Sequence, residues 1–155
     1  LRSFEQVIRD INDHEDFVPR IVESTVVCAD ADPVTYARVR HDLSFKFLFF
    51  GSDYSYRVHY FIEDMLEERE ALRTWWTLDE SIDGDMSAIT GSWYFERIDL
   101  NGTEYTYVRY ATQTVFRETV FGLKGAFQRF GANDVARMMD AMRDEAVTRS
   151  AMAKR

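Results

Sequence analysis

The sequence lacks the signals that mark several large classes of protein. Its 155 residues contain a single cysteine, Cys28, so the chain cannot form an internal disulfide. It has no apolar run long enough to cross a membrane as a helix. It also has no zinc-ligand spacing, no phosphate-cradling glycine loop and no Ser/His/Asp order. We therefore expect no metal site, no cofactor and no membrane span.

Positive charge is scarce as well. The chain has 27 Asp and Glu residues against 19 Lys and Arg residues, a formal net charge of −8. Such a surface repels nucleic acid and anionic membranes, so we expect neither as a partner. The length fits one domain over residues 1–155, and the cytoplasm is the default location. Because the chain begins at Leu1 rather than at Met, the sequence leaves open whether the protein has an N-terminal targeting segment.

An alternation of apolar and polar residues with a period of two predicts a long pair of antiparallel strands within residues 37–62. A two-residue loop at 51–52 would give every apolar residue an apolar partner. The pairs would be Phe49–Tyr54, Phe47–Tyr56, Phe45–Val58, Leu43–Tyr60 and His41–Ile62. On the opposite, polar face this register sets Arg40 against Glu63.

A second strand pair surrounds Asn101 and Gly102, the strongest short hairpin signal in the chain, because both central positions of that turn need positive φ. The two predicted strands are Ser87–Leu100 and Thr103–Phe116. An even-length loop puts Trp93 opposite Tyr110 on the inner face and leaves Arg109 outside. A loop of three or five residues would exchange the faces and carry Arg109 inward.

The remaining segments predict helices at both ends of the chain. We expect a short helix over 3–11, a helical turn before Pro19, strands over 21–31 and 72–78, and a solvated turn over 63–71. Residues 117–131 predict an aromatic, partly helical connector. Asn133 is a good N-cap, and a helix runs from it to about Arg149. The apolar stripe of this helix is Val135, Met138, Met139, Met142 and Ala146. Methionine fills irregular space, so the stripe suits a helix over a cavity or over an imperfect core.

The order of these elements resembles that of a known superfamily. A short helical pair that ends at residues 16–19 precedes antiparallel strands with residues 91–95 and the Asn101–Gly102 turn, and a long helix follows. This pattern is similar to the START-like superfamily, also called SRPBCC, which includes polyketide cyclases and coenzyme Q-binding proteins. The resemblance implies an α+β helix-grip fold, in which a curved antiparallel sheet of about six strands wraps around the C-terminal helix. In that family a first strand precedes the helices, and here nothing before Leu1 supplies it.

The predicted inner surface is rich in side chains that have an apolar body and a polar tip. A buried polar group without a partner costs about 1–3 kcal/mol, and a ligand or ordered water in a pocket would supply partners. Alternatively, the tips reach the rim of the sheet or bond to the backbone. The predicted ligand-binding residues are Phe45, Phe47, Tyr54, Tyr56, Tyr60, Trp76, Trp93, Tyr110, Met138, Met139 and Met142.

Two functional hypotheses follow from the resemblance and the residues. The first is the binding or transport of a small hydrophobic or aromatic, lipid-like molecule between the sheet and the C-terminal helix. The second is a cyclase, aromatase or dehydratase that acts on a polyketide-like substrate in the same cavity. The weak catalytic candidate is His41, the one histidine predicted to point inward. A lone inward histidine is more often structural than catalytic.

Overall fold

A computed structural model describes residues 1–30, 34–47, 50–117 and 123–152 of the chain. The N-terminal elements are α1 (Arg2–Arg9), the 3-10 turn η1 (Ile11–Asp13) and α2 (His14–Phe17). The strands are β1 (Ile21–Ala29), β2 (Tyr36–Phe47), β3 (Phe50–Met65), β4 (Ala71–Ser81), β5 (Met86–Leu100) and β6 (Thr103–Phe116). The remaining helices are α3 (Leu66–Arg69), between β3 and β4, and α4 (Leu123–Met152).

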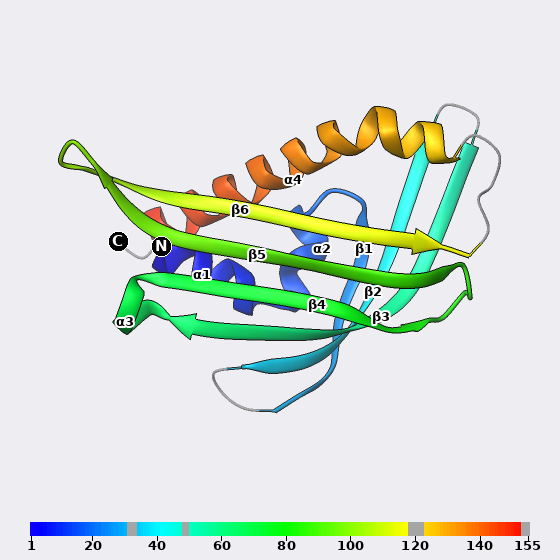
Figure 1. Ribbon diagram of the computed structural model, residues 1–155, viewed down its shortest axis with the longest axis horizontal. Coiled ribbons are helices and arrows are strands. Elements are labelled where there is room, and N and C mark those ends of the chain that lie inside the picture. Colours follow the sequence, from blue (N-terminus) through cyan, green and yellow to red (C-terminus); the bar gives the residue numbers. More distant parts are fainter. Residues whose placement is uncertain (31–33, 48–49, 118–122, 153–155) are drawn as a thin grey trace.

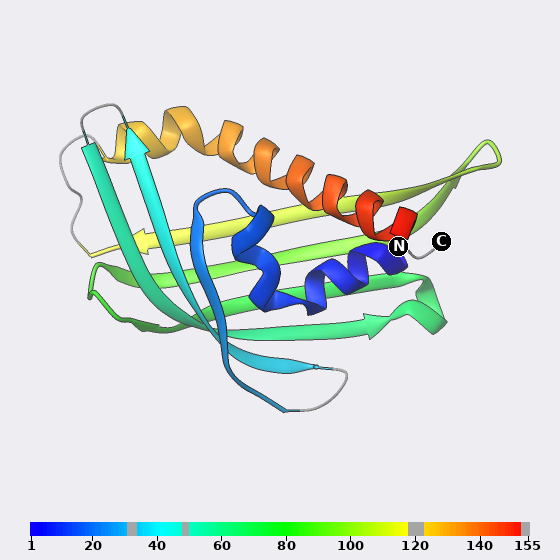
Figure 2. The same cartoon turned by 180° about the vertical axis from the view of Figure 1, so that it is seen from behind.

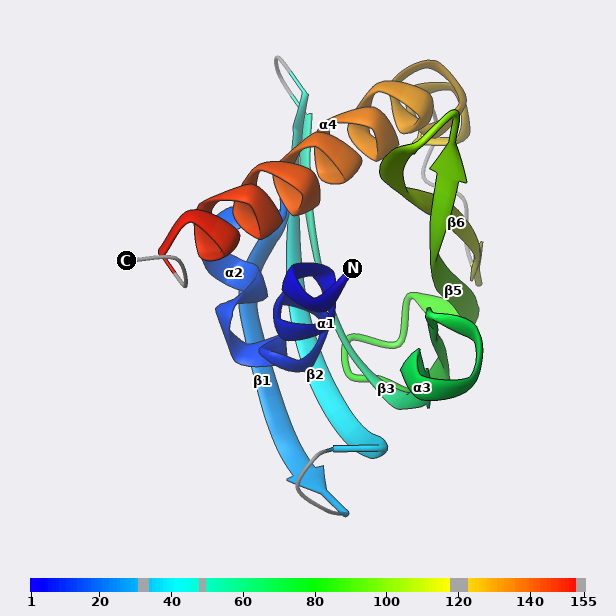
Figure 3. The same ribbon diagram turned by 90° about the vertical axis from the view of Figure 1, so that its left-hand side faces the viewer.

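The six strands form one sheet in the order in which they occur in the sequence, and each pairs antiparallel with the next. Figures 1 and 2 show α4 running along the length of the sheet, with α1 and α2 on the same side. The sheet curves around α1 when the molecule is viewed from its end (Figure 3). The predicted α+β helix-grip class, with a short helical pair near the N-terminus, is confirmed.

The register of the β5–β6 hairpin is confirmed. Trp93 lies opposite Tyr110, and the tight turn has Asn101 at φ 57° and Gly102 at φ 79°. Positive φ at both positions produces a turn whose twist matches that of the strands, which is why Asn-Gly is favoured there. The guanidinium carbon of Arg109 lies 5.5 Å from the centre of the outward-facing Tyr94 ring, so Arg109 is not part of the inner face.

The register predicted between β2 and β3 is wrong, although the faces are right. His41 pairs with Tyr56 instead of Ile62, and Arg40 faces Arg57. Phe47 pairs with Phe50, so the centre of the loop lies between 48 and 49, three residues before the predicted position between 51 and 52. Residues 48–49 lie outside the described part of the chain. Alternation cannot detect this error, because an even total shift keeps every side chain on its own face.

Two predicted boundaries also differ from the structure. Helix α4 already begins at Leu123, so Asn133 lies inside the helix and is not its N-cap. Most of the predicted connector is therefore helix, while its residues 118–122 lie outside the described part of the chain. Glycine lowers helix stability by only about 1 kcal/mol relative to alanine, so Gly131 does not stop a helix that packing supports. Strand β3 continues to Met65, which leaves a shorter turn than predicted before β4.

The apolar stripe of α4 faces inward, as predicted. Met142 and Ala146 are 3% and 2% exposed, while Met138 and Met139 are half-buried. The C-terminal end of α4 is held to the N-terminal helices by Arg149, whose guanidinium pairs with Asp10, Asp13 and Glu145. The principal core contains these α4 side chains, Val7, Ile8 and Ile11, and the sheet residues Ala37, Val39, Val58, Leu72 and Phe95.

Gly91 on β5 allows the indole of Trp76 on the neighbouring strand β4 to lie flat against the sheet. A Cβ atom at Gly91 would be 2.1 Å from an indole carbon of Trp76, far inside van der Waals contact. By contrast, a Cβ atom at Gly131 in α4 would have no heavy atom within 4 Å. The two glycines therefore form a matched pair for substitution by alanine, because one is closely packed and the other is not.

We expect Gly91→Ala to lower the free energy of unfolding by about 1–3 kcal/mol, because the indole or the strand must move. Gly131→Ala should raise it by about 0.5–1 kcal/mol through better helix propensity. Urea unfolding measures both. Equal effects of the two substitutions would contradict the close packing of Trp76 on Gly91.

Candidate functional site

The inner face of the sheet has a closed half next to α1. Many sheet side chains of this half are 0–5% exposed, and most of these share one cluster with side chains of the N-terminal helices and of the C-terminal half of α4. They include Ala37, Val39, Val58, Tyr60, Ile62, Leu72, Thr74 and Phe95. Phe4 of α1, for example, lies with its ring centre 5.2 Å from that of Phe95. This half is packed core.

The other half of the same face is less completely covered. Several inward side chains of β2, β3, β4 and β6 there are only half-buried. They are His41, Leu43, Phe45, Tyr56, Trp76, Leu78 and Tyr110. A smaller buried cluster of Tyr54, Met86 and Ile89 lies at the far end, and Tyr56 and Trp76 pack against both clusters. The half-buried aromatic side chains therefore lie where the two clusters meet, in the open half of the face.

Aromatic rings form a continuous floor that runs from the closed half into this region. The ring centre of Tyr110 lies 4.4 Å from that of Trp93 and 6.0 Å from that of Trp76. Tyr60 stacks on Trp76 at 6.1 Å with an interplanar angle of 13°. Offset and tilted ring pairs at these distances attract each other and keep the rings in fixed orientations. The floor is thus a rigid apolar surface.

The structure places the described members of the predicted ligand-binding set on the inner face of the sheet or on the facing stripe of α4, and divides them between the two clusters. Tyr60, Trp93 and Met142 belong to the principal core, whereas Phe45 and Tyr54 belong with the far cluster. Met138 and Met139 pack beside the principal core from α4, and Tyr56, Trp76 and Tyr110 lie near the boundary. The backbone of Phe47 is part of β2, but its side chain lies outside the described part of the structure.

The inward tyrosines are uncharged hydrogen-bonding groups. The Tyr60 hydroxyl donates to Thr74 Oγ1 at 3.2 Å, and burial raises the pKa of Tyr60 to about 12. Burial also raises the pKa of Tyr56, with a further contribution from the neighbouring Tyr110, whose own pKa burial raises. Their hydroxyls stay protonated at neutral pH. The Tyr60 hydroxyl therefore finds its hydrogen-bond partner within the core. At this position the polar tip needs no ligand, which is the alternative that the sequence left open.

His41 lies directly opposite Tyr56, with 5.7 Å between the ring centres. Its Nδ1 atom is buried and has no hydrogen-bond partner within the described part of the chain. Burial lowers the pKa of His41 to about 3, helped by the nearby His14 and opposed by Asp42, so the imidazole is neutral at pH 7. Asp42 itself pairs with Arg40, at 2.8 Å between Oδ2 and Nη2. An unsatisfied polar atom in an apolar surface destabilises the protein unless something binds to it.

Arg20 is a residue of this region that the sequence did not reveal. Its guanidinium carbon lies 5.8 Å from the centre of the Phe45 ring, and its Nη2 donates to Asp134 Oδ1 of α4 at 3.2 Å. The backbone of Arg20 has φ 76°, a conformation that is strained for a residue with a side chain. Arg20 connects the floor to the helix above it, and no local pattern links residues that are 114 positions apart.

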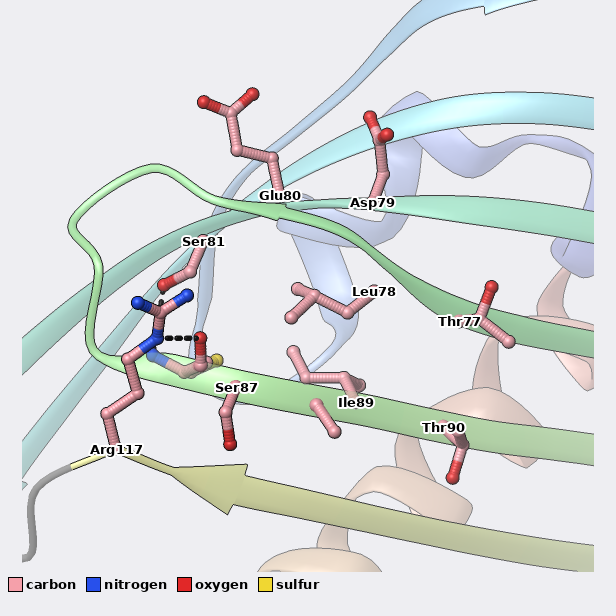
Figure 4. A pocket seen from close by; sticks show the side chains of 11 residues that line it. Thr77, Leu78, Asp79, Glu80, Ser81, Ser87, Ile89, Thr90 and Arg117 are labelled. Atoms are coloured by element: carbon pink, nitrogen blue, oxygen red, sulfur yellow. Dashed lines mark hydrogen bonds between the residues drawn. The ribbon is translucent and has the colours of Figure 1, made fainter.

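Two surface hollows occur in the described part of the structure, and the first borders the far cluster through Leu78, Met86 and Ile89. One, of about 520 Å³, lies where β4 and β5 separate beyond the Thr77–Thr90 pair, and is lined by residues that include Leu78, Ser81, Ile89 and Arg117 (Figure 4). The other, of about 560 Å³, lies beside β1. Neither contains a predicted ligand-binding residue. Among the described residues there is also no group of three or more potential metal ligands, and no described helix is long and apolar enough to span a membrane.

Comparison with known proteins finds similarity in structure only. No protein-family model matches the sequence, and no curated protein matches it either. A STAR-related lipid transfer protein from Xanthomonas axonopodis superposes with a TM-score of 0.67 at 14% identity, over 94% of this chain and 78% of that one. A START superfamily protein from Mycobacterium smegmatis gives 0.62 at 10% identity, over 95% and 89% of the two chains. At 10% and 14% sequence identity, this structural similarity shows that the fold is shared and shows nothing beyond the fold.

The buried histidines predict how stability depends on pH. Burial holds the pKa of His41 near 3 and lowers that of His14, while an unfolded histidine has a pKa near 6.5. Stability is therefore complete above pH 6.5 and falls as the pH drops, by up to ~1.4 kcal/mol per pH unit for each histidine. Urea unfolding at about pH 7.5, 6.5 and 5.5 measures this, above the range in which most carboxylates titrate. His41→Leu should remove one of the two contributions, and an unchanged slope would show that His41 is not held neutral.

Proposed function

Since this chain has the START-like fold, we propose that it binds a small hydrophobic or aromatic molecule between the inner face of the sheet and α4. The observation that carries the proposal is the uneven covering of that face. Tyr56, Trp76 and Tyr110 remain half-buried on a surface whose other half is 0–5% exposed. Large aromatic groups that stay partly exposed beneath a helix favour a ligand that completes their burial.

The chemistry of the surface supports an apolar ligand. The floor consists of rings, methionines and hydroxyls. Tyrosine hydroxyls are neutral at pH 7, and burial raises the pKa of Tyr56, Tyr60 and Tyr110 further. Burying ~100 Å² of additional apolar surface would contribute roughly 2.5 kcal/mol to binding. Met138 and Met139 on α4 are flexible side chains that adapt to ligands of different shape. One structural neighbour is named as a lipid transfer protein, which agrees with this class of ligand.

The cyclase or dehydratase hypothesis has less support. A general base works best when its pKa lies near the working pH, and burial holds that of His41 near 3. The tyrosines have raised pKa values, so they donate hydrogen bonds and do not readily release protons. These groups favour binding over proton transfer in the ligand-free protein.

The three tryptophans provide a direct test of where a ligand binds. Trp76 and Trp93 face inward, whereas Trp75 lies on the outer face, stacked on Phe61 at 5.2 Å. We expect the contact quencher 1-bromonaphthalene to reduce the tryptophan fluorescence of Trp75→Phe, which keeps both inner indoles, and to shift its thermal midpoint upward.

The matched control is the double variant Trp76→Phe/Trp93→Phe, in which only Trp75 emits. Quenching there should be at least several-fold weaker at the same probe concentration. Equal quenching in the two proteins, or quenching of Trp75 alone, would place the probe elsewhere and contradict the proposed site. Native mass spectrometry with lipids, quinones and aromatic polyketides would then identify the preferred ligand class.

A further inference from the structure

His41 is the one polar side chain of the floor that the structure leaves with a buried, unpartnered atom in its described part. The flanking charges do not compensate for it, because Arg40 and Asp42 pair with each other. The next inward tyrosine along β3, Tyr54, is 4% exposed, whereas Tyr56 opposite His41 is half-buried. His41 and Tyr56 therefore form a small polar position within a ring-lined surface.

We propose that His41 is the polar anchor of this ligand site, and that the ligand is an uncharged amphiphile whose hydroxyl group hydrogen-bonds to the imidazole Nδ1. This inference rests on the proposed function and narrows its ligand class. A neutral imidazole nitrogen is either a donor or an acceptor, according to the tautomer, and a hydroxyl group serves both cases. A carboxylate would bring an unpaired charge into an apolar surface, which is strongly unfavourable.

The comparison of two histidines on neighbouring strands supports a special role for His41. His59 points to the outer face, where its Nδ1 pairs with the Tyr36 hydroxyl at 2.9 Å and its Nε2 lies 3.3 Å from Asp79 Oδ1. Both ring nitrogens of His59 thus have partners in the protein itself. His41, on the inner face, has a buried Nδ1 that finds no partner among the described residues.

The test uses three probes of the same shape, naphthalene, 2-naphthol and 2-naphthoate, with isothermal titration calorimetry at pH 7. We expect 2-naphthol to bind about 5–10-fold more tightly than naphthalene, the gain from one added hydrogen bond to a group otherwise unsatisfied. We expect 2-naphthoate to bind at least 10-fold more weakly than 2-naphthol. In His41→Leu the preference for 2-naphthol should fall to twofold or less while naphthalene still binds, and His41→Gln should restore part of it.

The matched control is His59→Leu, which removes a histidine from the outer face and should leave the preference for 2-naphthol unchanged. A second readout separates an anchor from a structural histidine. Without ligand, His41→Leu should raise the thermal midpoint by about 2–6 °C, because it removes an unsatisfied buried atom. A structural histidine would instead lower it.

The outcomes distinguish the two proposals. Equal binding of naphthalene and 2-naphthol, or a preference that persists in His41→Leu, would overturn the anchor while leaving an apolar site in place. A lowered midpoint in His41→Leu would overturn it as well. Failure of all three probes to bind would contradict the proposed function itself, and the anchor would fall with it.

Discussion

The apolar face of the sheet is longer than the short helices that pack against it, and this mismatch determines where the protein is closed and where it is open. Strand β3 has 16 residues and spans ~50 Å at ~3.3 Å per residue. Helix α1 has eight residues and is only ~12 Å long. The N-terminal helices therefore complete the core at one end, and α4 crosses the remainder. The half-buried rings of Tyr56, Trp76 and Tyr110 are the consequence.

The contacts that join α4 to the rest of the protein also differ between the closed and the open half. Near its C-terminal end, Met142 and Ala146 enter the core and Arg149 meets three carboxylates on α4 and the N-terminal helices. Single surface ion pairs contribute about 0–1 kcal/mol, but a network around one largely buried guanidinium fixes the orientation of the helix. Farther toward its N-terminal end, Asp134 makes a single pair with Arg20. Among the side chains of α4 that the structure describes, the ion-pair network and the most deeply buried contacts lie where the core is closed.

Much of the fold was predictable because the alternation of residues is strong. The faces of β2 and β3, the Asn101–Gly102 turn and the apolar stripe of α4 all follow from local periodicity and turn chemistry. The register of β2 against β3 was not predictable, since registers that differ by an even shift bury the same side chains. The start of α4 was missed because packing outweighs the weak helix propensity of Gly131.

The candidate site was predictable as a set of residues but not as an arrangement. Alternation placed the tyrosines and tryptophans on one face, whereas their division between closed and open halves depends on which helix lies above them. The contact of Trp76 with Gly91 and the pair of Arg20 with Asp134 join segments that share no local pattern. Such contacts depend on tertiary structure, and no spacing in the sequence records them.

Two polar side chains on the same inner face show how the two halves differ physically. The Tyr60 hydroxyl lies among fully buried neighbours and donates to Thr74, so the closed half satisfies its own polar group. The Nδ1 atom of His41 lies in the half with half-buried rings and has no such partner in the described structure. A core that served stability alone would favour an apolar residue at position 41, because replacing an unsatisfied group by one of similar volume removes a desolvation penalty. The hydroxyl-bearing ligand that we propose would remove that penalty without a change of residue.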